Sequence, residues 1–270
     1  MMPEEEVLLS LSTNRYFPLD QLFDAVKELQ LDSVTVAVDE DGLHSMSLDY
    51  EHYRYFEWHA HRLILDCPHY ELKRPFTFSI DNITARPYFA ALMRAWDKLS
   101  IPYATHEIKV YQRGNKTFFA ASFYDFEFAV LVNRESVTPR PMKELQFRAH
   151  ARIYTDELSE ALKKLKKYRP DVIRLTLDSG RLDISAMKRD SEVGFEVIYP
   201  TRYDGEATAC YDAADFMRLC KIMSRYTSVV RLEFANNYPV KIEAAYVPGV
   251  LTFVLAPNIP GRLRHEPHSP

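Results

Sequence analysis

The clearest pattern along the chain is an amphipathic segment that occurs twice. Residues 20–29 read DQLFDAVKEL and residues 156–165 read DELSEALKKL, so most aligned positions carry the same or a similar residue. In both segments the apolar residues recur at intervals of three and four, which is helical spacing. Both also place carboxylates in the first turn, where the helix dipole favours negative charge. The sequence therefore predicts two equivalent helices.

Alternating strands follow each of these helices. Residues 34–38 (VTVAV) and 173–177 (IRLTL) are rich in β-branched and aliphatic side chains, and a turn of Asp, Ser or Gly ends each run. A second strand then begins near Gly42 in the first copy and near Gly180 in the second. This order predicts a helix, a strand and its hairpin partner in each copy.

The repeat continues to the end of each copy. A second helix is predicted at residues 88–100 and again at residues 215–227, with apolar and basic positions in the same register. Each copy then closes on two strands of high β-propensity. The predicted fold class is α+β, with two duplicated domains that each pack two helices on antiparallel β-sheets.

The boundaries follow from the same repeat. The N-terminal domain is predicted at residues 1–132 and the C-terminal domain at residues 146–259. Residues 133–145 contain two prolines and no clear period, which is typical of an extended connector. Residues 260–270 are rich in proline and poor in apolar side chains, so we expect a flexible tail.

The composition is that of an ordinary globular protein. Of 270 residues, 47% are hydrophobic and 27% are charged, which excludes the signature of a disordered chain. The three cysteines are widely spaced and form neither a disulfide framework nor a zinc motif. The N-terminus is acidic and no apolar run is long enough to span a membrane, so we expect an intracellular protein without a membrane partner.

Positive charge is concentrated on the predicted helices, although the net charge of the chain is −4. Cations gathered in this way suit non-specific contact with phosphates. For any one helix the alternative is a solvated surface face. The candidate DNA-contacting residues are Lys27, Arg86, Arg94, Lys98, Lys163, Lys164, Lys166, Lys167, Arg218, Lys221 and Arg225.

Two motifs carry a family resemblance. Residues 239–259 form a strand pair that ends in Leu-Ala-Pro-Asn-Ile, and Gly42 is followed by Leu-Asp-Tyr-Glu-His at residues 48–52. With these motifs, nearly the whole chain resembles the proliferating cell nuclear antigen family, the DNA polymerase sliding clamps of eukaryotes and archaea. The first copy departs most, because Leu48 stands where the family has methionine and because its first helix is poor in basic residues.

The resemblance implies the DNA clamp fold in a subunit of a closed ring, a probable trimer whose helices line a hole for duplex DNA. It also implies that subunits join through edge strands near residues 127–132 and 194–199. The expected function is that of a processivity factor for DNA replication and repair. Its expected partners are other clamp subunits, a clamp loader, and DNA polymerase, ligase and nuclease. No cofactor, metal ion or catalytic residue is expected, nor any enzymatic activity, and the location would be the cytoplasm or nucleoid of an archaeon or the nucleus of a eukaryote.

The resemblance further implies a site for short peptides of partner enzymes, beneath the connector. An apolar groove with exposed backbone suits such a peptide, although ordinary packing is the alternative for each residue. The residues carried over by position are Leu48, Val137, Met142, Leu145, Pro239, Val254, Leu255, Ala256 and Pro257.

Two alternatives stay open. The chain could be one member of a heterotrimer or a checkpoint-type clamp, because sequence motifs do not determine which subunits pair. A metal-dependent nucleic-acid enzyme is less favoured, since its only support is His59 and His61, with His52 or His69 nearby. The phosphate-binding glycine loops and nucleophile motifs of common enzyme classes are lacking.

Overall fold

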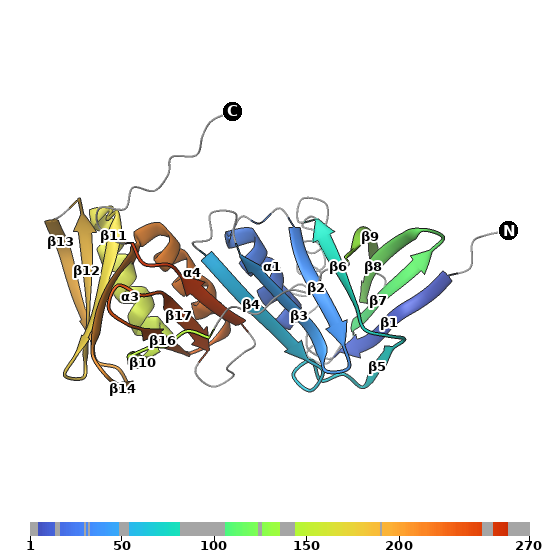
Figure 1. Cartoon of the computed structure of the whole chain (residues 1–270), viewed down its shortest axis with the longest axis horizontal. Helices are drawn as coiled ribbons and strands as arrows, with labels where there is room; N and C mark the ends of the chain where they lie inside the picture. Colours follow the sequence, from blue (N-terminus) through green and yellow to red (C-terminus); the bar gives the residue numbers. More distant parts are fainter. Residues whose placement is uncertain are drawn as a thin grey trace, which may run out of the picture. The chain divides into compact units, whose positions relative to one another are not determined.

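The computed structural model describes residues 5–13, 17–29, 31, 33–48, 54–81, 106–123, 126–135, 144–189, 191–244 and 251–258. They fall into two compact units (Figure 1), the first within residues 1–50, 55–142 and 249–251 and the second within residues 51–54, 143–248 and 252–270. The predicted tail and the predicted helix at residues 88–100 lie outside the described residues. Within them, no helix has the length and apolar character needed to cross a membrane.

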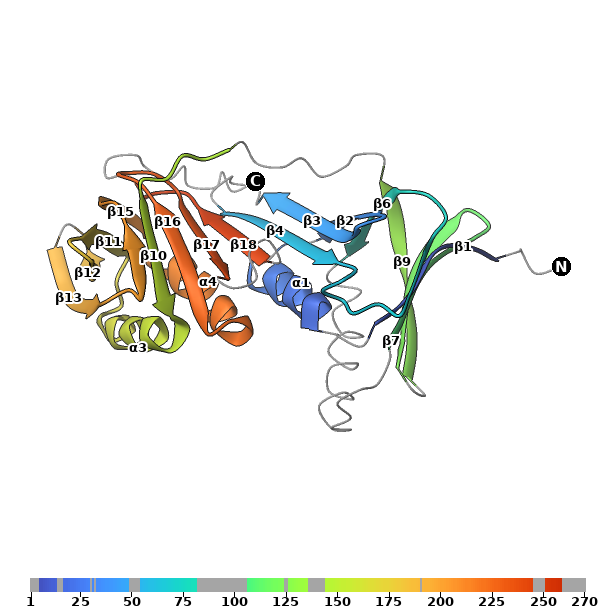
Figure 2. The same ribbon diagram turned by 90° about the horizontal axis from the view of Figure 1, so that it is seen from below.

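Nine strands and one helix are described in the first unit. The helix is α1 (Phe17–Glu28), and the strands are β1 (Glu5–Thr13), β2 (Ser33–Asp39), β3 (Gly42–Leu48), β4 (Arg54–His61), β5 (His69–Leu72), β6 (Phe76–Asp81), β7 (His106–Arg113), β8 (Lys116–Phe123) and β9 (Phe126–Glu135). Their hydrogen-bonded order is β4-β3-β2-β6-β9-β8-β7-β1-β5, and neighbouring strands pair antiparallel wherever the structure describes both of them. Helix α1 covers one side of the β2–β3–β4 region (Figure 2).

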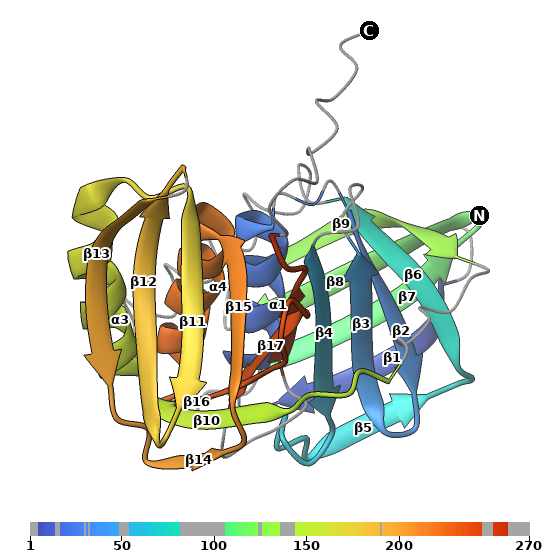
Figure 3. The same cartoon turned by 60° about the vertical axis from the view of Figure 1, so that its left-hand side comes forward.

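The second unit repeats this order. Its helices are α3 (Thr155–Leu165), the 3₁₀ turn η1 (Lys166–Tyr168) and α4 (Ala213–Tyr226), and its strands are β10 (Ala149–Tyr154), β11 (Val172–Asp178), β12 (Arg181–Lys188), β13 (Ser191–Ile198), β14 (Arg202–Asp204), β15 (Ala207–Asp212), β16 (Val229–Phe234), β17 (Val240–Ala244) and β18 (Leu251–Leu255). One sheet has the order β13-β12-β11-β15 and the other β14-β10-β16-β17-β18. Figure 3 shows the first of these sheets with α3 and α4 behind it.

The strand orders confirm the predicted duplication. The series β4-β3-β2-β6 matches β13-β12-β11-β15, and β5-β1-β7-β8-β9 matches β14-β10-β16-β17-β18, strand for strand. Even the link between the two series is similar. The end of β9 pairs with β6, and in the second unit Asn258, just after β18, donates its backbone N–H to the carbonyl of Cys210 in β15 at 2.7 Å.

Both units have an apolar core between helix and sheet. In α3 the buried residues recur at helical spacing, and those of α4 include Phe216 and Ile222, both fully buried. Strands such as β11 and β15 alternate buried and exposed side chains, as expected when one face meets the helices. The aromatic residues Phe56 and Trp58 of β4 are also fully buried, so they belong to the core of the first unit.

The predicted connector begins later than the sequence pattern indicates. Residues Asn133 to Glu135 extend β9, because they pair with residues 77–79 of β6. A strand that has a partner on one side continues for as long as its backbone groups find hydrogen bonds. The sequence shows no apolar alternation here, so the extension could not be seen before the pairing was known.

Candidate nucleic-acid interface

Helices α3 and α4 lie side by side and form one surface of the second unit (Figure 3). Their apolar residues face the sheets, so the side chains between these stripes point outward. A groove of about 330 Å³ runs between the two helices. It is lined by Ser159, Leu162, Lys163, Lys166, Met217, Cys220, Lys221 and Ser224.

Three of the predicted cations therefore lie around a single groove. Lys163 comes from α3, Lys166 from η1 and Lys221 from α4, and all three are exposed. The last turn of α3 carries Lys163 at the negative end of the helix dipole, which favours a cation there. The arrangement offers several ammonium groups to one anionic ligand, with serine hydroxyls between them.

Lys164 and Arg218, two of the predicted cations, form ion pairs with carboxylates of the protein. The Lys164 ammonium lies 3.2 Å from Glu196 of β13 and 3.8 Å from Glu160. The Arg218 guanidinium lies 3.6 Å from Asp215 in the first turn of α4. Such neighbours lower the net charge that these side chains present to a ligand.

The remaining predicted cations are placed as follows. Lys167 is exposed in η1, and Arg225 is exposed in the last turn of α4. Lys27 is exposed in the last turn of α1, in the first unit. Arg86, Arg94 and Lys98 lie outside the described residues.

A free cysteine forms part of the wall of the groove. Cys220 is fully buried, and burial raises the pKa of its thiol well above the ordinary value. Cys67 behaves similarly, because burial, followed by the nearby Asp66 carboxylate, raises its pKa to about 11. Both thiols therefore stay protonated and weakly nucleophilic at neutral pH.

Among the described residues, each unit has a strand with an unpaired edge near the positions that the resemblance implies. Strand β13 pairs only with β12 in the described part of the chain. Strand β9 pairs with β8 along residues 126–132, and its other side meets β6 only at residues 133–135. Large apolar side chains are exposed on both strands, namely Leu131 and Phe195.

The predicted peptide-binding residues are only partly brought together. Val254 and Leu255 are buried in β18, and Leu255 is paired with Val240, the residue after Pro239. Ala256 and Pro257, like Pro239, are half-buried. Leu145 is half-buried before β10, and Leu48 is the last residue of β3. Val137 and Met142 lie outside the described residues.

A pocket of about 600 Å³ is lined by residues next to Leu145 and Pro239 in the sequence, among them Gln146 and Tyr238. The rings of Phe147 and Tyr238 meet edge to face in its wall, with centroids 6.0 Å apart. The other lining residues are Glu144, Gln146, Arg148, Ala235 and Asn236. Neither aromatic residue is among those predicted for the peptide site, although each is close in sequence to a predicted residue.

Histidines of β3 and β4 lie close to one another and to carboxylates. His44 and His59 lie opposite each other on β3 and β4, with their Nδ1 atoms 2.8 Å apart, and their Nε2 atoms face Asp39 and Glu57 at 2.9 Å and 2.7 Å. His61 lies 3.9 Å from Asp41. No group of three or more potential ligands is arranged to hold a metal ion in the part of the chain that the structure describes.

The fold of the chain is identified by comparison with solved structures and not by comparison with known sequences. No protein-family model matches the sequence, and no curated protein sequence matches it either. Solved structures do match along nearly their whole length. The fold is that of proliferating cell nuclear antigen.

Three of these solved structures are forms of proliferating cell nuclear antigen. The PCNA2–PCNA3 complex from Sulfolobus tokodaii is 14% identical at a TM-score of 0.72, covering 92% of this chain and 99% of that one. The protein from Entamoeba histolytica is 14% identical at a TM-score of 0.73, and the match covers 94% of this chain and 100% of that one. The A. fulgidus protein, solved with the C-terminal region of FEN-1 bound, is 17% identical at a TM-score of 0.71. The match covers 93% of this chain and 98% of that one. They confirm the fold that the sequence resemblance implied.

Proposed function

We propose that the chain is a subunit of a ring-shaped sliding clamp that encircles duplex DNA and tethers replication and repair enzymes. The observation that carries the proposal is the lysine-lined groove between α3 and α4, on a fold shared with clamps over more than nine-tenths of the chain. The chain would act as a scaffold and carry out no reaction itself.

The charge of the groove suits sliding. Lysine ammonium groups attract phosphates without reading bases, because the interaction comes from released counterions and carries no sequence information. Lys163, Lys166 and Lys221 are exposed on flexible side chains, so each can exchange one phosphate for the next. The overall charge of −4 does not prevent such a contact, because positive charge is concentrated locally on this face.

Ring closure would use the open edges of β9 and β13. An unpaired strand edge with exposed apolar side chains favours pairing with another chain. Two different edges on one subunit give a head-to-tail contact, which closes into a ring when the rotation permits. Light scattering should give about three times the chain mass of 31.5 kDa. A stable monomer would instead support the heterotrimeric alternative, in which other subunits are required.

Partner enzymes would bind near the Phe147–Tyr238 pocket and the residues on either side of it. Aromatic walls and a polar rim suit a short peptide with an apolar anchor. The A. fulgidus structure contains the C-terminal region of FEN-1, so a nuclease peptide is the first partner to test. The variant Tyr238→Ala should weaken such a peptide at least several-fold while leaving ring mass unchanged.

The test of DNA contact is a charge reversal of the groove. The variant Lys163→Glu/Lys166→Glu/Lys221→Glu removes three phosphate contacts, so the slope of log affinity against log salt should fall by about three. Polymerase stimulation should fall with it. The control is Lys116→Glu/Arg181→Glu/Lys188→Glu, which makes the same charge change on exposed strand residues.

The two variants separate local contact from overall charge. If both weaken DNA binding equally, only net charge matters and the groove has no special role. If the groove variant keeps the salt slope of the unmodified protein while its assembly is intact, the proposed interface is wrong.

A further inference from the structure

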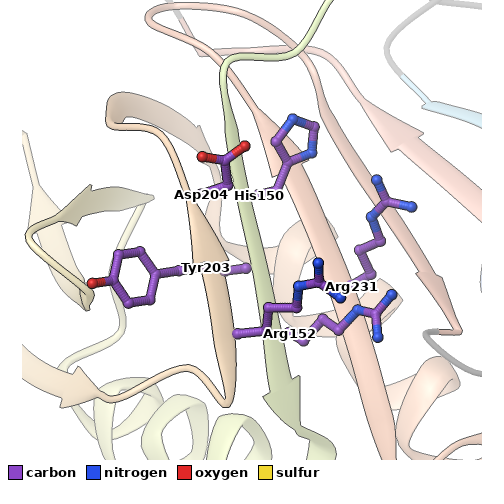
Figure 4. Close-up of a pocket in the computed structure, with 7 residues that line it drawn as sticks. His150, Arg152, Tyr203, Asp204 and Arg231 are labelled. Atoms are coloured by element: carbon purple, nitrogen blue, oxygen red, sulfur yellow. The ribbon is translucent and has the colours of Figure 1, made fainter.

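A second cationic site lies on the second unit, on strands β14, β10 and β16. A cleft of about 280 Å³ opens there and is lined by His150, Ala151, Arg152, Arg202, Tyr203, Asp204 and Arg231 (Figure 4). On β10 the side chains of Ala151 and Ile153 are buried in the core, so Arg152 between them points to the opposite face. The cleft therefore lies on the side of the sheet away from the helices.

Three arginines form a straight row across this cleft. Arg152 of β10 lies directly opposite Arg202 of β14 on one side and directly opposite Arg231 of β16 on the other. Neighbouring strands are about 4.8 Å apart, so the row is roughly 10 Å long at the backbone. Like charges directly opposite each other destabilise a sheet. An anion between them would remove that cost.

Carboxylates of the protein neutralise only one end of the row. The Arg231 guanidinium contacts Glu233 and lies 3.4 Å from Glu243, two glutamates whose side chains are almost fully buried. Lys241 also lies between these glutamates, at 3.3 Å and 2.9 Å. Two cations thus balance two anions. The burial of Lys241 opposes its charge, but its contacts with Glu243 and Glu233 outweigh this effect and raise its pKa.

The other two arginines keep their charge. In the described part of the chain neither Arg152 nor Arg202 forms an ion pair with a carboxylate. Asp204 is the remaining acidic residue of the cleft. It lies opposite His150, two residues along each strand from the pair Arg152 and Arg202. Figure 4 shows Asp204 and His150 together at one end of the cleft and Arg152 at the other.

We propose that the arginine row, Arg202, Arg152 and Arg231, binds a phosphate monoester group. Two uncompensated guanidinium groups match the charge of a monoester dianion, about −1.5 to −2 at neutral pH. Its three terminal oxygens can accept hydrogen bonds from two adjacent guanidinium groups at once. A carboxylate has only two oxygens, and a single guanidinium group can bind both of them. A phosphodiester of DNA carries a single charge and fits the row less well. This site is separate from the helix groove and does not depend on the proposed function.

The experiment measures phosphate binding to the full chain by isothermal titration, with inorganic phosphate as the first ligand and a phosphoserine tripeptide as the second. The variant Arg152→Ala/Arg202→Ala should lower the affinity for both at least tenfold. Arg152→Lys/Arg202→Lys keeps the charge but loses the forks, so its affinity should fall by a smaller factor. The matched control Arg181→Ala/Lys188→Ala removes two cations from β12 and should bind as the unmodified protein does.

The outcomes separate the sources of the phosphate. Tighter binding of the phosphoserine peptide than of inorganic phosphate assigns the site to a phosphorylated partner, and equal binding assigns it to a free phosphate compound. The proposal is overturned if the Arg152→Ala/Arg202→Ala variant is folded by circular dichroism and binds both ligands as before. It is also overturned if that variant loses affinity only for duplex DNA.

Discussion

Helix α1 of the first unit and helix α3 of the second bury equivalent residues but expose different ones. Leu22 and Leu158 are both almost fully buried, and so are Ala25 and Ala161 one turn later. On the exposed side α1 has one cation, Lys27, whereas α3 and η1 carry four lysines. Packing against the sheet therefore fixes one face of a duplicated helix. The other face is free to diverge, so a difference in its charge points to what it contacts.

The strands beside these helices show a second difference. In the first unit, Thr13 of β1 pairs with His106 of β7 where β1 ends before helix α1. In the second unit, Ile153 of β10 pairs with Val230 of β16 where β10 ends before helix α3. All four side chains are buried. The first unit has placed an ionisable ring where the second has an apolar side chain. Burial of this ring should add to the stability of the first unit a pH dependence that the equivalent position of the second unit does not contribute.

The largest effect is expected from the shared core. Leu22→Ala and Leu158→Ala each remove a buried side chain and leave a cavity, so each should lower the free energy of unfolding of its own unit by about 2–5 kcal/mol. Hydrogen exchange would locate the loss in one unit or the other. If one of the two substitutions costs less than about 0.5 kcal/mol, the packing of the two copies is not equivalent.

A smaller effect is expected from His106. Burial lowers its pKa to about 4 from the ordinary 6.5, so the folded state holds the neutral ring. As pH falls below 6.5 the unfolded chain gains a proton that the folded chain does not, and stability is lost until about pH 4. The full loss is about 3 kcal/mol. The variant His106→Val copies the residue type of the second unit and should remove this part of the pH dependence.

Urea denaturation of the unmodified protein and of His106→Val between pH 7.5 and pH 4.5 would measure this loss of stability. Other carboxylates and histidines titrate in this window, so the relevant quantity is the difference between the two proteins at each pH. A difference that is constant with pH would show that His106 is charged or solvated in the folded protein.

Much of the fold follows from sequence because its pattern is local. The spacing of Leu158 and its equivalents, and the alternation in residues 173–177, depend only on neighbours along the chain. The cationic helix face was predicted for the same reason. Arg152 and Arg231 are different, since they meet only because β10 and β16 pair in one register, which no local pattern contains. The Phe147–Tyr238 contact likewise depends on how two distant loops meet.

The smallest effect should distinguish two adjacent lysines of the helix face. Lys163 lines the groove, while Lys164 is held by Glu196 and Glu160. Lys163→Ala should lower the salt slope of DNA binding by about one. Lys164→Ala should lower it by less, and because its ion pairs are exposed it should change the stability of the second unit by under about 1 kcal/mol. Fluorescence anisotropy with a duplex at several salt concentrations measures both slopes. Equal slopes for the two variants would mean that Lys164 leaves its carboxylates when DNA is present, in which case Lys164 adds to the contact that the groove lysines form.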